Sequence, residues 1–282
     1  STNNKVVIAH NSGTGSVGKA SVFGNTGFTL PSLGSPIVYS TANTSGDIAY
    51  DPSSNKIVIA YSDGGNSSYG TAVVGTVSGT SISFGSPVVF ESANVAHISA
   101  TFDSTNNKVV IAYRDNGNSD YGTAIVGTVS GTSISFGSST TFESSDIYYP
   151  SITFDSSNNK VVVGYRKYAS DGTKYHHARV GTVDPSNNSI TFGAAEPINT
   201  NGESAYFDMI FDSSSGKIIV AYSDESNNFN GTVKVGTVTV GASPSNDTIS
   251  FGSANVYYSA GQSTAKCLAA DTSNNRIVLV SH

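Results

Sequence analysis

The chain has 282 residues, which is enough to bury a hydrophobic core in one large domain or in two ordinary ones. Helix-favouring leucine, methionine and glutamate are scarce, whereas Val, Ile, Thr, Tyr and Phe dominate, so the composition indicates an all-β protein. The net charge of −6, with basic residues spread singly, argues against a nucleic-acid-binding surface. No apolar run approaches the roughly 18 residues that span a bilayer, so we expect no membrane insertion.

The first residue and the cysteine content suggest where the protein acts. The chain begins with Ser1, so we expect either a processed product or part of a larger parent chain. Its single cysteine, Cys267, cannot form an internal disulfide. We therefore expect an extracellular, cell-surface or virion-associated protein of bacterial or viral type, whose stability rests on packing.

An apolar segment recurs six times along the chain, at intervals of 51 to 59 residues. A typical copy, Lys56–Tyr61, is apolar without alternation, which predicts a strand covered on both faces, the second strand of each repeat. The copies begin at Lys5, Lys56, Lys108, Lys160, Lys217 and Arg276. We expect one domain, 1–282, with repeats at about 1–50, 51–102, 103–154, 155–211 and 212–270 and a partial repeat at 271–282.

A turn and a short first strand precede each of these segments. Residues 103–107 combine an aspartate that can accept backbone hydrogen bonds with asparagines that tolerate left-handed geometry. Residues 98–102 before the turn read as a strand, so the first and second strands form a hairpin. The same turn begins at Asp51, Asp103, Asp155, Asp212 and Asp271.

Two further strands complete the repeat. Residues 70–77 predict a third strand, whose central Gly75 suits close approach of a neighbouring sheet. Residues 81–85 alternate polar and apolar side chains, which is typical of a half-exposed outer strand, the fourth. Four antiparallel strands per repeat predict a β-propeller; a β-solenoid is the structural competitor. The pattern gives one strand more than five four-stranded blades need, so we favour five blades over six.

The repeats also resemble a known group of proteins. Residues 50–90 and 102–142 carry the motifs Asp-Ser-Thr-Asn-Asn-Lys, Val-Val-Ile-Ala-Tyr, Tyr-Gly-Thr-Ala and Val-Gly-Thr-Val-Ser-Gly-Thr-Ser-Ile-Ser-Phe-Gly, with small variations. These units resemble repeats in surface and tail-associated proteins of marine bacteria and their phages. In architecture the chain is similar to propeller lectins, which implies sugar binding in pockets around the ring.

Strand direction divides the loops between two faces. The loops from second to third strand, and those from each fourth strand to the next repeat, share one face, called the upper face below. The hairpin turns between first and second strands share the lower face. The lower turns are nearly identical and the upper loops differ, so we expect the upper face to carry function.

The upper loops combine carboxylate, amide and aromatic groups, which suit a sugar because its hydroxyls need donors and acceptors and its apolar face stacks on rings. The alternative is that Asp and Asn only close these loops while Tyr packs on the strand edge. The candidate ligand-binding residues are Asp63, Asn66, Tyr69, Arg114, Asp115, Asn118, Tyr121, Arg166, Tyr168, Tyr175, His176, Asp224, His97 and Tyr149.

Metal ligands are a separate question. Asp115, Asn118 and Asp120 alternate like the ligands of a calcium loop, but the terminal glutamate of an EF-hand is missing. His176 and His177 are adjacent on a strand and point to opposite faces, so they are not expected to share a metal. We expect no cofactor, with calcium at the Asp115 loop as the alternative.

An enzyme is the second functional class to consider. Counting back four residues from each turn aspartate gives Asp47, Ser99, Ser151, Asp208 and Cys267. The carboxylates Asp47 and Asp208 therefore occupy equivalent positions, and such a pair could act as acid and base in a glycosidase or lyase. A hydrolase normally adds an arginine cluster, a tyrosine nucleophile or a metal set, and the upper openings of the other blades offer only His97, Tyr149 and Lys266. We therefore favour a non-enzyme and expect Cys267 to lie in the core.

The leading hypothesis is an adhesin-like, lectin-like module that recognises carbohydrate or a cell-surface glycan. The alternatives are a structural propeller unit of a phage fibre or surface assembly, and a polysaccharide-degrading enzyme. Exposed end strands could pair with another chain, so besides a glycan we also expect self-assembly as a form of partnership.

Overall fold

The computed structural model describes residues 5–12, 17–24, 32–42, 44–168, 172–199, 204–259, 267–271 and 274–280. Within this part the chain forms strands and two single-turn 3-10 helices, Glu225–Asn227 and Pro244–Asn246, and no α-helix. No helix in the described ranges is long and apolar enough to cross a membrane. The all-β prediction is confirmed.

Each complete repeat forms one antiparallel sheet, or blade. The first complete blade consists of β5 (Thr44–Asp51), β6 (Lys56–Asp63), β7 (Tyr69–Ser78) and β8 (Ser81–Phe84), paired in that order. The same order recurs in three further blades. Their strands are β9 (Val88–Asp103), β10 (Lys108–Asp115), β11 (Tyr121–Ser130), β12 (Ser133–Phe136), β13 (Thr140–Asp155), β14 (Lys160–Tyr168), β15 (Lys174–Asp184), β16 (Ser189–Phe192), β17 (Glu196–Pro197), β18 (Ser204–Asp212), β19 (Lys217–Asp224), β20 (Asn230–Thr239), β21 (Thr248–Phe251) and β22 (Asn255–Tyr258).

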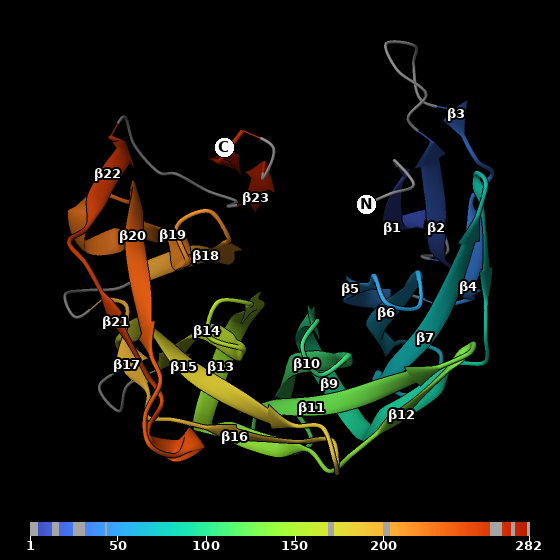
Figure 1. Cartoon of the computed structure of the whole chain (residues 1–282), viewed down its shortest axis with the longest axis horizontal. Helices are drawn as coiled ribbons and strands as arrows, with labels where there is room; N and C mark the ends of the chain where they lie inside the picture. The colour runs from blue at the N-terminus through green and yellow to red at the C-terminus, as the bar shows by residue number, and fades with distance from the viewer. Residues whose placement is uncertain are drawn as a thin grey trace.

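A sheet and a hairpin flank these four blades. The N-terminal sheet contains β1 (Lys5–Ser12), β2 (Val17–Gly24), β3 (Ser32–Leu33) and β4 (Ile37–Ser40), and the C-terminal hairpin pairs β23 (Cys267–Asp271) with β24 (Arg276–Val280). The sheets follow one another around a ring, and β1 and β23 lie on opposite sides of its opening (Figure 1). The first strands of successive repeats, β5, β9, β13, β18 and β23, contact one another around the centre.

The outer edge of each blade differs from the single fourth strand predicted at residues 81–85. β8 pairs with only the second half of β7, whereas the first half pairs with Val88–Asn94 at the start of β9. From Val95 onward the same long strand pairs with β10 and becomes the first strand of the next blade. Strand β13 repeats this passage from the edge of one blade to the inside of the next.

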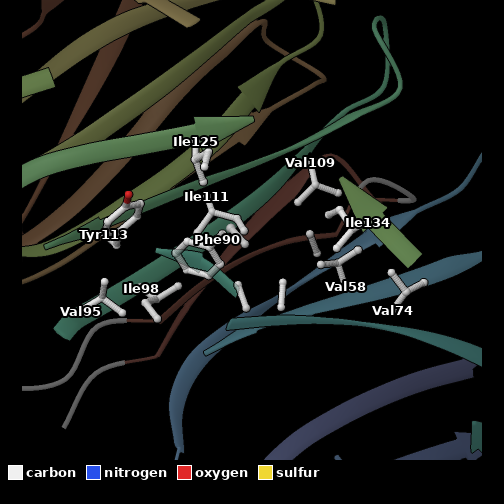
Figure 2. Packing of buried hydrophobic residues seen from close by; sticks show 14 residues of the cluster. Val58, Val74, Phe90, Val95, Ile98, Val109, Ile111, Tyr113, Ile125 and Ile134 are labelled. Atoms are coloured by element: carbon white, nitrogen blue, oxygen red, sulfur yellow. The ribbon is translucent and has the colours of Figure 1, made fainter. Parts of the chain in front are cut away.

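The second strands are buried on both faces, as their unbroken apolar sequence predicts. Along β10, the alternate residues Val109, Ile111 and Tyr113 pack back against the preceding blade, in a cluster with Val58 and Val74. Figure 2 shows these side chains gathered between the two sheets. The intervening residues of β10 pack forward against the following blade, in a cluster with Val161, Val163 and Tyr165. One strand therefore supplies side chains to two cores, which is why it shows no alternation.

The lower turns form as predicted. Asp103 Oδ1 accepts the backbone N–H groups of Thr105 and Asn106, each at 3.0 Å, and Asn107 takes a left-handed φ of 54°. The ammonium of Lys108 then donates to Thr128 Oγ1 at 2.6 Å, which ties the second strand to the third. Equivalent lysines in the other complete blades make the same bond.

Close packing between blades depends on a different glycine from the one predicted. Gly75 faces Ile57, Ile82 and Phe84 of its own blade, so it makes room for local side chains and not for a neighbouring sheet. Gly85, after the outer strand, is where the next blade comes closest. A Cβ atom on Gly85 would lie 1.8 Å from the carbonyl oxygen of Thr132.

Gly85→Ala should therefore force adjacent blades apart and lower the free energy of unfolding by about 1–3 kcal/mol. The matched control is Gly252→Ala, because a Cβ atom there would meet only the Val235 oxygen of its own blade, at 3.7 Å. We expect the control to change stability by less than about 0.5 kcal/mol. Urea unfolding of both variants measures the difference, and equal losses would contradict this account of blade packing.

Candidate binding site at the upper mouth of the central channel

A local distortion places aromatic side chains at the upper end of the first strands. His97, Tyr149 and Tyr206 each stand six residues before the turn aspartate and have positive φ values of 49°, 51° and 46°. The strand register shifts at each of these places, as in a β-bulge. Positive φ is unfavourable for bulky residues, so the surrounding structure must hold these rings in place. Tyr149 remains 45% exposed.

The bulges border a cavity at the upper mouth of the channel, with a volume of about 380 Å³. Its walls come from four first strands, since Ser45 belongs to β5, residues 97–99 to β9, residues 149–151 to β13, and Phe207 and Asp208 to β18. The residues are distant in sequence and meet only because the blades form a ring. A separate cavity at the lower mouth is lined partly by Tyr50, Phe102, Phe154 and Phe211.

Aromatic rings and two guanidinium groups gather on the rim of the upper cavity. The centroid of the His97 ring lies 4.6 Å from that of Tyr149 and 5.5 Å from that of Tyr148. The Tyr148 and Tyr168 ring centroids are 5.4 Å apart. The Cζ atom of Arg114 lies 4.6 Å from the Tyr148 ring centroid, within the range of a cation–π contact. We call His97, Arg114, Tyr148, Tyr149, Arg166 and Tyr168 the rim cluster.

Arg114 is held by carboxylates as well as by the ring. Its guanidinium donates from Nε and Nη2 to Asp146 Oδ1, at 3.0 and 2.9 Å, and Nη2 lies 3.1 Å from Asp120 Oδ2. Asp146 pairs with Tyr121 in the part of β13 that forms the edge of Arg114's own blade, so the ion pair lies within one blade, just before β13 passes to the next. Arg114 is thereby oriented and neutralised within the protein.

The environment of His97 is electropositive. Burial, followed by the nearby guanidinium groups of Arg114 and Arg166, lowers the pKa of His97, and Asp146 opposes them. The imidazole is therefore neutral at pH 7 and offers one donor and one acceptor nitrogen to a ligand.

The carboxylates considered as a catalytic pair hold blades together. Asp47 Oδ2 accepts the N–H of Ala100 in the next blade at 2.9 Å, and Asp208 Oδ2 accepts the N–H of Leu268 in β23 at 2.8 Å. Asp208 Oδ1 also accepts the Ser151 hydroxyl at 3.0 Å. Burial raises the pKa of Asp208 despite these donors. Both carboxylates therefore serve as hydrogen-bond acceptors between blades.

Several predicted residues close the upper loops and stand outside the rim cluster. Oδ1 of Asp63, Asp115 and Asp224 accepts a backbone N–H two residues onward, at 3.0, 3.1 and 3.1 Å. The backbone N–H groups of Asn66 and Asn118 donate within the same loops. Tyr69 and Tyr121 begin β7 and β11 and are half-buried. The contacts at these positions agree with the alternative that Asp and Asn close the loops and Tyr packs on the strand edge.

Two expectations, those for His176 and Cys267, need correction. His176 is fully buried and stacked on Phe207, with ring centroids 4.6 Å apart, so it is a core residue that a ligand cannot reach. Tyr175, its neighbour, is half-buried and lies edge-on to His177. Cys267 is exposed at the start of β23 and does not lie in the core.

In the described structure, the carboxylates of the Asp115 loop contact protein groups. Asp115 turns toward the N–H of Gly117, and Asp120 turns toward Arg114. The described ranges contain no group of three or more His, Cys, Asp or Glu side chains that could hold a metal ion.

Sequence reasoning selected five of the six rim residues but missed Tyr148, as well as Asp146 and Tyr206. The five residues expected near a ligand that meet here are His97, Arg114, Tyr149, Arg166 and Tyr168. The missing signal was positional: Ser45, His97, Tyr149 and Tyr206 share one place in the repeat, six residues before the turn aspartate. Comparing this column across the repeats would have found Tyr206.

The comparisons with known proteins identify the fold. No protein-family model and no curated protein matches the sequence. The chain is similar to a structure from Bacteroides uniformis provisionally assigned as a 6-phosphogluconolactonase, with 13% identity and a TM-score of 0.56 over 99% of this chain and 72% of that one. The fold of the present chain is therefore propeller-like.

Two weaker similarities accompany that match. Hsv2 from Kluyvelomyces marxianus is 9% identical, with a TM-score of 0.49 over 84% of this chain and 67% of that one. A Hadza microbial sialidase is 10% identical, with a TM-score of 0.48 over 89% of this chain and 54% of that one. At such identities a structural likeness shows the fold and leaves activity undecided.

The electrostatics of the rim cluster can be tested at His97. Arg166→Gln removes one of the cations that lower its pKa, so the His97 pKa should rise toward the ordinary value of about 6.5. An NMR pH titration measures it, with the signals assigned from His97→Gln. Lys217→Gln is the control, because the Lys217 ammonium donates to Thr237 far from the rim cluster. If the pKa of His97 does not change in Arg166→Gln, the guanidinium of Arg166 does not lower it.

Proposed function

We propose that this protein is a carbohydrate-binding module of an extracellular, cell-surface or virion-associated protein, and that the rim cluster holds the sugar. The observation that carries the proposal is the exposed Tyr149 ring, fixed by a strained backbone beside a cavity of about 380 Å³. A sugar ring stacks its apolar face on such an aromatic surface.

Polar groups around the rings supply the rest of the recognition. Neutral His97 can donate and accept hydrogen bonds, and Ser45 on β5 brings a hydroxyl to the same cavity. Because the bulges and the ion pair of Arg114 fix these groups before a ligand arrives, little conformational entropy is lost on binding. This preorganised arrangement favours a binding module.

Tyr149→Ala should weaken glycan binding about tenfold, because it removes the main stacking surface. Glycan-array screening of the whole protein, with and without calcium, would identify a ligand, and calorimetry would compare the variants. The control is Tyr50→Ala, whose ring is 41% exposed at the lower mouth of the channel. If no glycan binds, or if both variants lose affinity equally, the proposed site is wrong.

We further propose that the ring closes with five blades, through pairing of β23 with β1. In the complete blades, the residue four before the turn aspartate pairs with a small residue of the second strand: Asp47 with Ala60, Ser99 with Ala112, Ser151 with Gly164 and Asp208 with Ala221. The equivalent Cys267 faces Val280 in the hairpin. Ala9 of β1 is the small residue that fits the pattern.

Exposed apolar side chains support the need for a further partner at these edges. Ile8 of β1 is 45% exposed, although its counterparts Ile59 and Ile111 are 1% and 0% exposed. Val278 and Val280 of β24 are likewise exposed. The same edges favour a second candidate function, a structural unit that pairs with another chain in a fibre or surface assembly.

A cysteine at position 9 separates these arrangements. If β23 pairs with β1, Ala9→Cys should form an intramolecular disulfide with Cys267 under mild oxidation, since paired Cα atoms lie within bridging distance. Val280→Cys is the control for the β23–β24 hairpin. Non-reducing electrophoresis and mass measurement report the products. If a disulfide forms in Val280→Cys but not in Ala9→Cys, five-bladed closure is overturned. If Ala9→Cys forms disulfide-linked dimers, pairing with another chain is favoured.

A further inference from the structure

Arg166 is the cation of the rim cluster that lacks an anionic partner. Its Cζ atom lies 5.1 Å from the Tyr149 ring centroid, 5.4 Å from that of Tyr148 and 6.0 Å from that of Tyr168. No ion pair of Arg166 occurs among the described residues, and its Nε is buried without a hydrogen-bond partner. Leaving a buried charged donor unsatisfied is costly, so the structure holds this group at an energetic disadvantage.

Arg114 provides an internal comparison. Both arginines stand six residues after the lysine that begins the second strand, in adjacent blades, and both contact the Tyr148 ring. Arg114 has two carboxylates, whereas Arg166 has aromatic rings only. In the blades on either side, the same position carries the serines Ser62 and Ser223, each of which donates to a backbone carbonyl of its own loop. The free guanidinium is therefore a property of one place on the upper face.

The position of Arg166 relates it to the cavity. Tyr149 lines the upper cavity and also lies against the guanidinium of Arg166, so a ligand that contacts this ring comes within reach of the cation. Tyr149 is 45% exposed and lines the cavity, so a ligand can contact this ring where it stands.

We propose, on the basis of the carbohydrate-binding function above, that Arg166 selects acidic sugars by binding the carboxylate of a uronate-type residue. A planar guanidinium matches the two oxygens of a carboxylate through paired N–H groups. Stacking of the same sugar on Tyr149 would place its carboxylate near Arg166. The carboxylate of the ligand would thus be the anionic partner of Arg166, as the carboxylate of Asp146 is for Arg114.

The test is an NMR titration of the whole protein with glucuronate, glucose and acetate, following the Arg166 Nε–H and His97 signals. Glucuronate should shift both signals and bind at least about tenfold more tightly than glucose, because glucose lacks the charge. Arg166→Gln should reduce glucuronate affinity to that of glucose. Arg166→Lys keeps the charge without the fork and should recover only part of the preference. Lys217→Gln, which removes a charge on the lower face, should behave like the unaltered protein.

The outcomes separate this inference from the proposed function. Equal binding of glucose and glucuronate, unchanged in Arg166→Gln, would overturn the acidic-sugar inference and leave carbohydrate binding standing. Acetate binding at Arg166 as tight as that of glucuronate would support a carboxylate site but contradict sugar recognition. If none of the three compounds shifts the rim signals, both proposals fail.

Discussion

The structure depends on close contact between neighbouring sheets through strands that are buried on both faces. The second strands β6, β10 and β14 pack alternate side chains against the sheet before and the sheet after, as Val109 and Val110 do in β10. The sheets can approach this closely because glycines such as Gly85 leave room for a carbonyl of the next blade. Burial of apolar area on two faces supplies most of the stability, at roughly 25 cal/mol per Å². A blade on its own would expose both of these faces.

The centre of the ring uses polar groups for the same purpose. Asp47, Ser99 and Asp208 accept backbone N–H groups from the first strand of the next blade, so neighbouring inner strands are connected although they are not paired in a β-ladder. These bonds hold the first strands at fixed positions around the channel. The bulges at His97 and Tyr149 are then kept in their strained conformation, and the rings remain directed toward the upper mouth.

Repetition and variation divide the molecule into a scaffold face and a variable face. The lower turns repeat one hydrogen-bonding scheme, in which an aspartate such as Asp103 accepts two backbone N–H groups. The upper positions of the same strands change from Ser45 to His97 to Tyr149, and those of the second strands from Ser62 to Arg114 to Arg166. Since the scaffold tolerates these changes, the upper mouth can acquire a chemistry that no single repeat contains.

The sequence by itself determined the β composition, the repeat, the hairpin turns and the buried second strands, because these follow from local periodicity and turn chemistry. It also indicated the upper loops, and with them His97, Arg114, Tyr149, Arg166 and Tyr168. Only the tertiary structure decided that Tyr148 and Asp146 join them, that His176 is buried, and that Asp47 and Asp208 fasten blades. Contacts such as Arg114–Tyr148, Asp47–Ala100 and Asp208–Leu268 join residues 34, 53 and 60 positions apart, and no local pattern encodes which groups meet across such distances.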